Sequence, residues 1–208
     1  MSVVGLVIPT IFTRPEYLPI AIDSIQNQSN PAHLAISCPQ DLVDALTAKF
    51  PDVTVFAESK VVPLGQKINE ALRALPVDCE YIGWLGDDDL LLPGALEAAA
   101  KILDQNPEVV MVYGGCDYIS PSGEVLFTNS SSQFAAQLLS FGPQLIPQPG
   151  SLWRRDAFEK VGGLSGEFNL AFDFDLFLKL AEVGELRFIP QTLAQFRWHP
   201  DSLSVRRR

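Results

Sequence analysis

Glu80–Pro93 reads EYIGWLGDDDLLLP, and the order of residue types in this stretch predicts the fold around it. The apolar run Tyr81–Leu85 stops at Gly86, and a short apolar run that ends at glycine indicates a buried strand. The acidic triplet Asp87–Asp89 follows at once, and Pro93 then opens a helical pattern. We therefore expect the triplet just past the carboxyl end of a strand, at the edge where open α/β sheets bind ligands.

The acidic triplet allows two interpretations. Neighbouring carboxylates repel each other by roughly 4 kcal/mol per pair at about 4 Å and an effective dielectric constant near 20, which favours a bound cation. Hard oxygen ligands suit Mg²⁺ or Mn²⁺, and these ions commonly also hold substrate phosphates. The alternative is a solvated acidic turn that caps the next helix, because Asp is a good N-cap and acidic residues favour a first helical turn.

Composition indicates one globular domain over residues 1–208. The chain is 47% hydrophobic and 19% charged, which is enough for a large core. No apolar run approaches the roughly 20 residues that span a bilayer, and the start, MSVVGLVIPT, lacks the basic region and cleavage site of a signal peptide. Cys38, Cys79 and Cys116 match no zinc pattern and fit a reducing compartment, so we expect a cytoplasmic protein.

The net charge of −10 argues against nucleic-acid binding, which needs a basic face. A phosphate-bearing ligand would then need a metal ion or a few well-placed cations. The basic cluster Arg206–Arg208 is either a frayed tail or a point of peripheral contact with acidic lipid.

Strands and helices are expected to alternate over the first half of the chain. Strands are predicted at residues 3–8, 33–37, 53–57, 81–85 and 109–113, and helices at residues 13–26, 41–50, 65–72 and 93–106. Thr13 is the predicted N-cap of the first helix, with Glu16 three residues later. This alternation predicts a parallel sheet with helices on its faces.

The pattern changes in the second half. We expect a hairpin at 118–126, a weak helix at 133–141, a substrate-facing loop at 141–150, a strand at 151–154, a helical turn at 155–161, a helix at 173–183 and a last strand at 193–198. The expected fold is thus one α/β domain, with a nucleotide-binding half at 1–115 and a mixed acceptor-side half at 116–208.

Segments along nearly the whole chain together resemble the family 2 glycosyltransferases of GT-A fold. They are VIPTIFTRPEYL (7–18), LGQKINEAL (64–72), YIGWLGDDDLLLPGAL (81–96), SLWRRDAFEKVGGLSGEF (151–168), FDFDLFLKLAEVG (172–184) and FRWHPDSLS (196–204). The resemblance implies a three-layer α/β/α sandwich and an enzyme. It would move a sugar from a nucleoside diphosphate sugar to a glycan, lipid-linked or small-molecule acceptor, by single displacement with inversion.

The resemblance also implies a metal site. Asp87 and Asp89 match the two ends of the family's DXD motif, with Asp88 between them. Asp89 is then the direct ligand of Mn²⁺ or Mg²⁺, and Asp87 lies nearer the ribose. His199 matches a position that completes the metal site from the last strand, and a structural histidine is the alternative.

The donor-binding residues that the resemblance implies lie in two segments. Pro9, Thr10 and Arg14 match the family's first-strand loop, where base and ribose pack. Lys67 and Asn69 match its basic and polar helix start, with Lys67 near the diphosphate as a point charge. A plain surface lysine is the alternative for Lys67.

On the acceptor side, Asp173 matches the catalytic base, which removes the proton of the acceptor hydroxyl. Asp175 lies two residues on, and positions i and i+2 of a helix do not share a face, so one of the two should reach the site. The alternative is that both serve the helix start, as N-cap and dipole partner. Trp153 resembles a sugar- or acceptor-stacking position, and a core tryptophan is the alternative.

Two departures from the family keep other functions open. Phe172 stands where relatives often carry an acid, and Ser37–Asp41 replaces an Asp that reads a uracil-like base, so Asp41 takes that role or the role is absent. A non-catalytic nucleotide-sugar-binding module is therefore a second hypothesis. A Mg²⁺ nucleotidyltransferase ranks lower, because Pro9–Arg14 lacks the glycine-rich loop such enzymes place after the first strand.

Overall fold

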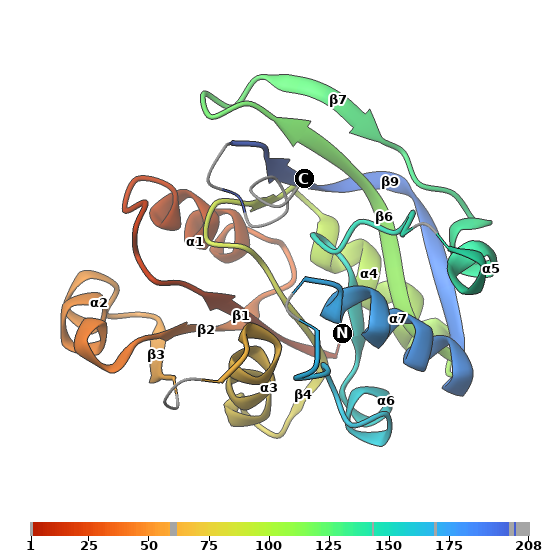
Figure 1. Cartoon of the computed structure of the whole chain (residues 1–208), viewed down its shortest axis with the longest axis horizontal. Coiled ribbons are helices and arrows are strands. Elements are labelled where there is room, and N and C mark those ends of the chain that lie inside the picture. Colours follow the sequence, from red (N-terminus) through yellow and green to blue (C-terminus); the bar gives the residue numbers. More distant parts are fainter. Residues whose placement is uncertain (1, 59–61, 143, 169, 200–201, 203–208) are drawn as a thin grey trace.

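The computed structural model of the chain describes residues 2–58, 62–142, 144–168, 170–199 and 202. The polypeptide forms one nine-stranded sheet that carries helices on both faces (Figure 1). None of the helices in these ranges is long and apolar enough to cross a bilayer. The predicted basic cluster Arg206–Arg208 lies outside the described residues.

The first half alternates strands and helices as predicted. Its strands are β1 (Val3–Pro9), β2 (Ala32–Cys38), β3 (Thr54–Ala57) and β4 (Cys79–Trp84). Its helices are α1 (Leu18–Gln26), the short η1 (Gln40–Leu42) with α2 (Val43–Lys49), α3 (Leu64–Ala74) and α4 (Ala95–Gln105). The strands pair in parallel in the order β3-β2-β1-β4, so their carboxyl ends share one edge of the sheet.

The second half makes the sheet mixed, as expected. It adds the strands β7 (Val125–Asn129), β8 (Leu152–Arg154) and β9 (Glu185–Arg197). They join β5 (Leu90–Leu91), a short strand of the first half that was not predicted, and β6 (Val109–Ile119), which begins in the first half. The helices of the second half are α5 (Ala135–Leu138) with η2 (Leu139–Phe141), α6 (Arg155–Lys160) and α7 (Phe172–Val183). The sheet continues as β8-β6-β9-β5, and β7 pairs with β6 off this path. Of these pairings β6–β9 is parallel and the others are antiparallel.

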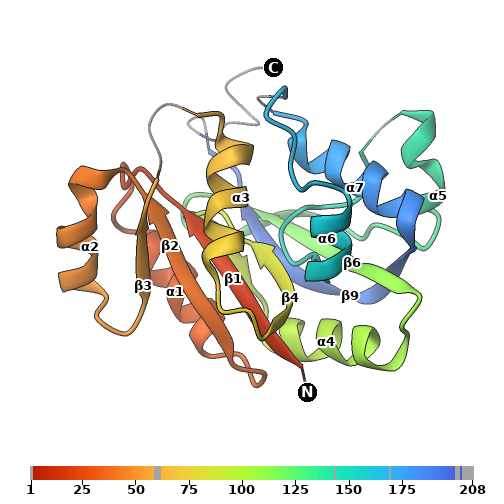
Figure 2. The same cartoon turned by 90° about the horizontal axis from the view of Figure 1, so that it is seen from below.

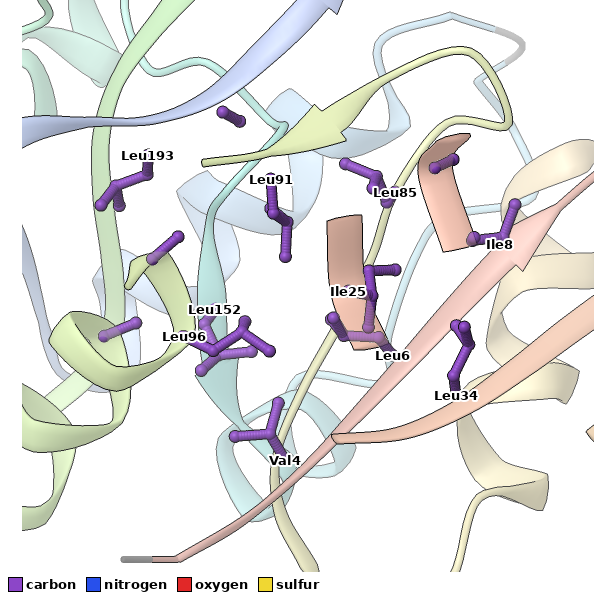
Figure 3. Packing of buried hydrophobic residues seen from close by; sticks show 14 of the residues in the cluster. Val4, Leu6, Ile8, Ile25, Leu34, Leu85, Leu91, Leu96, Leu152 and Leu193 are labelled. Atoms are coloured by element: carbon purple, nitrogen blue, oxygen red, sulfur yellow. The ribbon is translucent and has the colours of Figure 1, made fainter. Parts of the chain in front are cut away.

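Two hydrophobic cores lie on opposite faces of the sheet, which confirms the three-layer α/β/α prediction. One core takes the buried faces of α1, α2 and α4, and Figure 3 shows its packing around Val4, Ile25 and Leu96. The other takes the buried faces of α3, α6 and α7. Figure 2 shows α3, α6 and α7 together on one face of the sheet, away from α1 and α4.

The sequence of β1 explains its central place. Val4, Leu6 and Ile8 face one core and Val7 faces the other, so both faces of this strand are buried. A fully buried side chain of this size contributes about 1.5–3 kcal/mol relative to exposure. An apolar run on both faces is what a central parallel strand requires.

Helix α1 begins later than predicted, and Thr13 is not its N-cap. The helix starts at Leu18 with Tyr17 as the cap residue, and Pro19 lies in its first turn. A helix that started at Thr13 would place Pro19 in its interior, where proline lacks the N–H for the helical hydrogen bond and clashes with the preceding turn. Pro19 therefore sets the start of the helix.

The last strand is longer than predicted. β9 runs over 13 residues from Glu185, and the register between β6 and β9 shifts on both sides of Gly115. The part of the strand before residue 193 was not predicted, because Pro190 interrupts it and proline is rarely found in a regular inner strand. The register shift accommodates Pro190 and Gln191. The hairpin around Ser120–Glu124 is confirmed, with the Ser120 N–H donating to the Glu124 carbonyl at 2.8 Å.

Candidate active site

A cavity of about 570 Å³ lies at the carboxyl ends of the parallel strands. The acidic triplet lines it together with Pro9, Thr10 and Arg14, which follow β1. The structure thus brings the predicted donor loop and the triplet to one place. A cavity of about 860 Å³ lies elsewhere, between β9 and residues 130–134, and has no such cluster of carboxylates in its lining.

Asp87 is bound to the loop after β1. The Thr10 hydroxyl donates to Asp87 Oδ2 at 2.5 Å, and Arg14 Nη2 lies 3.2 Å from Oδ1. Burial raises the pKa of Asp87, and the adjacent Asp88 carboxylate raises it further, while Thr10 and Arg14 act in the opposite sense. The side chain therefore joins β1 to β4 at the cavity wall.

Asp88 brings His199 to the triplet. His199 Nε2 lies 2.6 Å from Asp88 Oδ2, although the two residues are 111 positions apart in the sequence. Arg14 Nη2 lies 3.3 Å from the same carboxylate oxygen, so this guanidinium bridges Asp87 and Asp88. The side chain of His199 is buried, which places an imidazole from the end of β9 directly beside the triplet.

Asp89 is the most buried carboxylate of the triplet, with only 4% of its surface exposed. Its Oδ1 accepts a hydrogen bond from the Arg197 backbone N–H at 3.0 Å. A Cβ at Gly86 would lie 2.6 Å from Asp89 Oδ2, so glycine is needed for this carboxylate to fold back. Burial, followed by the charge of Asp88, holds the pKa of Asp89 well above its usual value.

The donor set of the triplet suits a divalent cation. Carboxylate oxygens and an imidazole are ligands that Mn²⁺ accepts, and a cation would relieve the repulsion that raises the pKa of Asp89. Arg14 neutralises part of this charge, because its guanidinium lies 3.3 Å from Asp88 Oδ2. Among the described residues, one set of three possible ligand atoms lies within 4.8 Å of one another elsewhere, at His33, Asp78 and Cys79.

Lys67 lines the cavity, but it is not a free positive charge. Its ammonium group forms an ion pair with Glu58, which directly follows β3 and also lines the cavity. The sequence analysis missed Glu58, although its position just past a strand is the signal that identified the triplet. Asp41, the alternative base-reading residue, is exposed and outside the cavity lining.

Asp173 lies in the first turn of α7 and is not among the described residues that line the cavity. Gln144 Nε2 donates to Asp173 Oδ2 at 2.8 Å, and Gln148 of the same loop lines the cavity. Asp173 keeps part of its surface exposed, yet the protein surrounding it raises its pKa. Both glutamines belong to the predicted substrate-facing loop at 141–150. Gln148 donates to the Trp84 carbonyl at 2.8 Å, so this loop connects the cavity wall to Asp173.

The structure separates two predicted acceptor-side residues from the cavity. Asp175 pairs with Lys179 at 2.6 Å along α7. Asp173 instead accepts from Gln144, so the two carboxylates point to different sides of the helix, as the spacing of two residues predicts. Trp153 is 0% exposed and packs against Trp84 and Phe158, with ring centroids 5.1 and 6.4 Å away. Trp153 is therefore a core residue, the alternative to a sugar-stacking one, because no face of its ring is open to a sugar.

Asn69 also requires a correction. Its amide donates to the Leu164 carbonyl at 2.8 Å and accepts from the Leu164 N–H at 2.9 Å, both in the protein interior. These two bonds hold both ends of the amide in the protein interior, and Asn69 is absent from the described lining of the cavity. Asn69 therefore fixes the segment after α6 to α3.

Replacing Asn69 with alanine should destabilise the protein by about 2–4 kcal/mol, because it leaves two buried backbone groups without partners. Urea unfolding measures this cost. The matched control is Asn106→Ala, which loses one partly buried bond to the Ile102 carbonyl and should cost about 1 kcal/mol. Equal costs for the two variants, or a weaker donor affinity in folded Asn69→Ala, would contradict the structural role.

Solved structures of known proteins share this fold. S. aureus TarS 1–349 in complex with UDP-GlcNAc matches with a TM-score of 0.73 at 13% sequence identity, over 96% of this chain and 59% of that chain. TarS 1–349 in complex with UDP matches with a TM-score of 0.72 at 13% identity, over 96% of this chain and 61% of that chain. The mostly parallel, curled sheet is thus that of the GT-A-like glycosyltransferases.

The chain belongs to the glycosyl transferase family 2, whose family model matches residues 6–162. Hyaluronan synthase of Pasteurella multocida is 26% identical over 128 residues, which cover 61% of this chain and 13% of the relative. An uncharacterized glycosyltransferase of Rickettsia typhi is 24% identical over 208 residues, which cover 94% of this chain and 64% of the relative. The chain therefore spans only part of the length of these relatives.

Proposed function

We propose that this chain transfers a sugar from a nucleoside diphosphate sugar to an acceptor hydroxyl, and that a divalent cation binds at the acidic triplet. The observation that carries the proposal is the triplet in the wall of a cavity of about 570 Å³ at the carboxyl edge of the sheet. Pockets for small ligands commonly have volumes of about 300–1,000 Å³. The TarS structures with UDP and UDP-GlcNAc support a donor of this class.

The donor's nucleoside is proposed to lie against the loop after β1. Pro9 and Ile11 offer apolar surface to the base and ribose, and Thr10 holds Asp87 in place beneath them. Arg14 also lines the cavity, and its guanidinium would have to exchange its contacts with Asp87 and Asp88, at 3.2 and 3.3 Å, for the diphosphate when a cation binds at the triplet. Lys67 adds less charge than expected because Glu58 neutralises it.

Asp88, Asp89 and His199 are the residues that would hold the cation. A divalent cation at this place would neutralise the charge that develops on the departing nucleoside diphosphate. The Arg197 N–H fixes the Asp89 carboxylate in advance, and the absence of a side chain at Gly86 leaves room for it, so it need not reorganise when the donor binds. The contact between His199 Nε2 and Asp88 Oδ2 fixes the orientation of the Asp88 carboxylate.

Asp173 is proposed as the catalytic base. Its raised pKa makes the carboxylate a better proton acceptor at neutral pH than an exposed aspartate. Gln144 donates to one of its oxygens at 2.8 Å, and the Phe174 N–H donates to the other at 2.9 Å. A single base that serves one displacement is consistent with inversion at the anomeric carbon. Phe172, in place of the family's acid, is buried beside Trp84 and takes no part.

The acceptor, whether glycan, lipid-linked or small molecule, is proposed to approach along the exposed side of Gln144 and the start of α7, which the Gln144–Asp173 hydrogen bond holds together. This placement would bring the acceptor hydroxyl to Asp173, and the acceptor would pass Gln148 on its way to the cavity.

Cys38, Cys79 and Cys116 are all free and buried, which supports the proposed cytoplasmic location.

A non-catalytic nucleotide-sugar-binding module is the second candidate. The Lys67–Glu58 pair and Phe172 favour it, because both leave the site with fewer groups for chemistry than the family pattern. Such a module would bind the donor with the same metal requirement. It would show neither transfer nor slow hydrolysis of the donor in any acceptor mixture.

A thermal-shift panel of UDP, GDP, dTDP, CDP and ADP, each with Mn²⁺, Mg²⁺ or EDTA, tests the proposal. A nucleotide at 100 times its Kd stabilises by about 2.7 kcal/mol, which raises Tm by several degrees in a domain of this size. We expect one nucleotide to stabilise only with metal. Stabilisation that ignores EDTA would detach the triplet from metal binding, and no shift with any nucleotide would contradict the donor class.

A further inference from the structure

We propose that His33, Asp78 and Cys79 form a second metal site, suited to Zn²⁺, at the end of the sheet opposite the acidic triplet. An imidazole nitrogen, a carboxylate oxygen and the thiol sulfur all lie within 4.8 Å of one another. His33 is near the start of β2 and Cys79 is the first residue of β4. The triplet follows the other end of β4, so the two sites are separated by the length of a strand.

Strand β1 runs between the two strands that supply these ligands, and Gly5 opens the space across it. His33 pairs with Gly5, and Cys79 pairs with Val3 of the same strand. A Cβ at Gly5 would lie 3.0 Å from Cys79 Sγ, so a larger residue would crowd the thiol. Glycine at this register position therefore lets side chains from β2 and β4 meet over β1.

Asp78 is placed by the turn that connects α3 to β4. The Cys79 N–H donates to the Pro76 carbonyl at 3.1 Å, which closes this turn and presents Asp78 beside the thiol. Cys79 is fully buried, whereas His33 and Asp78 are exposed. An ion would thus bind to a buried sulfur on its inner side and to two exposed side chains on its outer side.

The ligand set fits zinc better than magnesium or manganese. Zn²⁺ binds Cys sulfur at about 2.3 Å and His nitrogen or carboxylate oxygen at about 2.0–2.2 Å, usually in a tetrahedron. Ligand atoms in such a tetrahedron lie about 3.4–3.7 Å apart, so the three groups need to close by about 1 Å. In the described part of the chain no hydrogen bond holds the His33 ring or the Asp78 carboxylate away from this movement.

The charges balance when the thiol proton leaves. A bound cation would displace the thiol proton of Cys79 to solvent. The thiolate and Asp78 then supply two negative charges for the two positive charges of the ion. Arg155 stays at a carbonyl pair, with Nη2 3.2 Å from Leu72 O and 3.3 Å from Leu75 O. Three protein ligands leave a fourth position for water.

Titration of the full chain with Co²⁺, with excess Mg²⁺ present to occupy the triplet, tests this site. Cobalt bound to a thiolate gives a near-ultraviolet charge-transfer band that oxygen ligands do not give. We expect this band in the wild type, its loss in Cys79→Ser, and its retention in Cys38→Ser, which removes a buried thiol at the other end of β2. Competition with Zn²⁺ should abolish the band.

Two exposed ligands keep the test independent of folding. Loss of an indirect partner alone weakens metal binding by about 10- to 100-fold, so His33→Ala and Asp78→Asn should each weaken Co²⁺ binding by at least about 100-fold. Absence of the band from the wild type, an equal band in Cys79→Ser, or unchanged affinity in both exposed variants would overturn the proposal. None of these readouts depends on sugar transfer.

Discussion

Asp89→Asn should lower kcat by at least about 10³-fold and abolish the stabilisation of the protein by nucleotide with Mn²⁺. The loss corresponds to about 4 kcal/mol of transition-state stabilisation, within what a metal that neutralises a leaving group supplies. The asparagine oxygen can still accept the Arg197 N–H, so the backbone arrangement around the triplet should persist. Sugar-transfer assays and thermal shifts with UDP and Mn²⁺ measure the two effects.

The same substitution should make the metal-free protein more stable at neutral pH. The folded protein holds the pKa of Asp89 above its value of about 3.9 in the unfolded chain. Folded Asp89 therefore binds its proton more tightly, and stability falls as pH rises from about 4 through the raised pKa. Asp89→Asn removes this part of the slope. Asp87, whose pKa is also raised by burial, retains its share.

Asp52→Asn is the matched control, because Asp52 is an exposed carboxylate in the turn before β3. It should change neither turnover nor the response to Mn²⁺. If Asp89→Asn retains full turnover with Mn²⁺, the triplet does not hold a catalytic metal. If the metal-free variant is less stable than the wild type at pH 7, the ionised Asp89 carboxylate does not destabilise the folded protein as its burial implies.

Asp173→Asn should lower kcat by about 10²- to 10⁴-fold, the usual contribution of a general base. Its amide oxygen can still accept from Gln144, so the start of α7 should hold its place. Donor binding should stay unchanged, because Asp173 lies outside the described lining of the donor cavity. Comparison of kcat with the nucleotide-induced Tm shift separates an effect on the chemical step from an effect on donor binding.

The pH dependence gives a second readout for Asp173. The base must be ionised, so wild-type turnover should fall as pH is lowered through the raised pKa of Asp173, and this limb should vanish in the variant. Asp175→Asn is the control on the same helix, because its carboxylate pairs with Lys179. Turnover of Asp173→Asn within threefold of the wild type would assign the proton to another group.

Much of the fold follows from local patterns. Val3–Ile8 and Tyr81–Leu85 are apolar without interruption, and such runs bounded by Pro or Gly leave few alternatives to buried parallel strands. The first half of β9 could not be found in this way, because Pro190 and Gln191 are tolerated only through the register shift opposite Gly115. That shift depends on the partner strand, which no local window contains.

The site residues also fall into those that local sequence predicts and those that depend on distant partners. The placement of Asp87 follows from the rule that parallel strands end at one edge, and Glu58 obeys the same rule after β3, whereas Thr10 and Arg14 were expected from the resemblance to the family. Gln148 could not be predicted, since the Trp84 carbonyl that fixes it is 64 residues away. Asn69 is the reverse case, because its partner Leu164 is 95 residues distant and gives it a structural task.

Arg197 joins the two halves of the chain in a way that tolerates sequence change. Its Nε donates to the Asp88 carbonyl at 3.0 Å, and its Nη1 lies 3.2 and 3.0 Å from the carbonyls of Ser120 and Pro121. All three acceptors are backbone oxygens, which every residue possesses. The hairpin turn can therefore diversify during evolution, and with it the surface beside the site, while the arginine keeps the turn attached to the triplet.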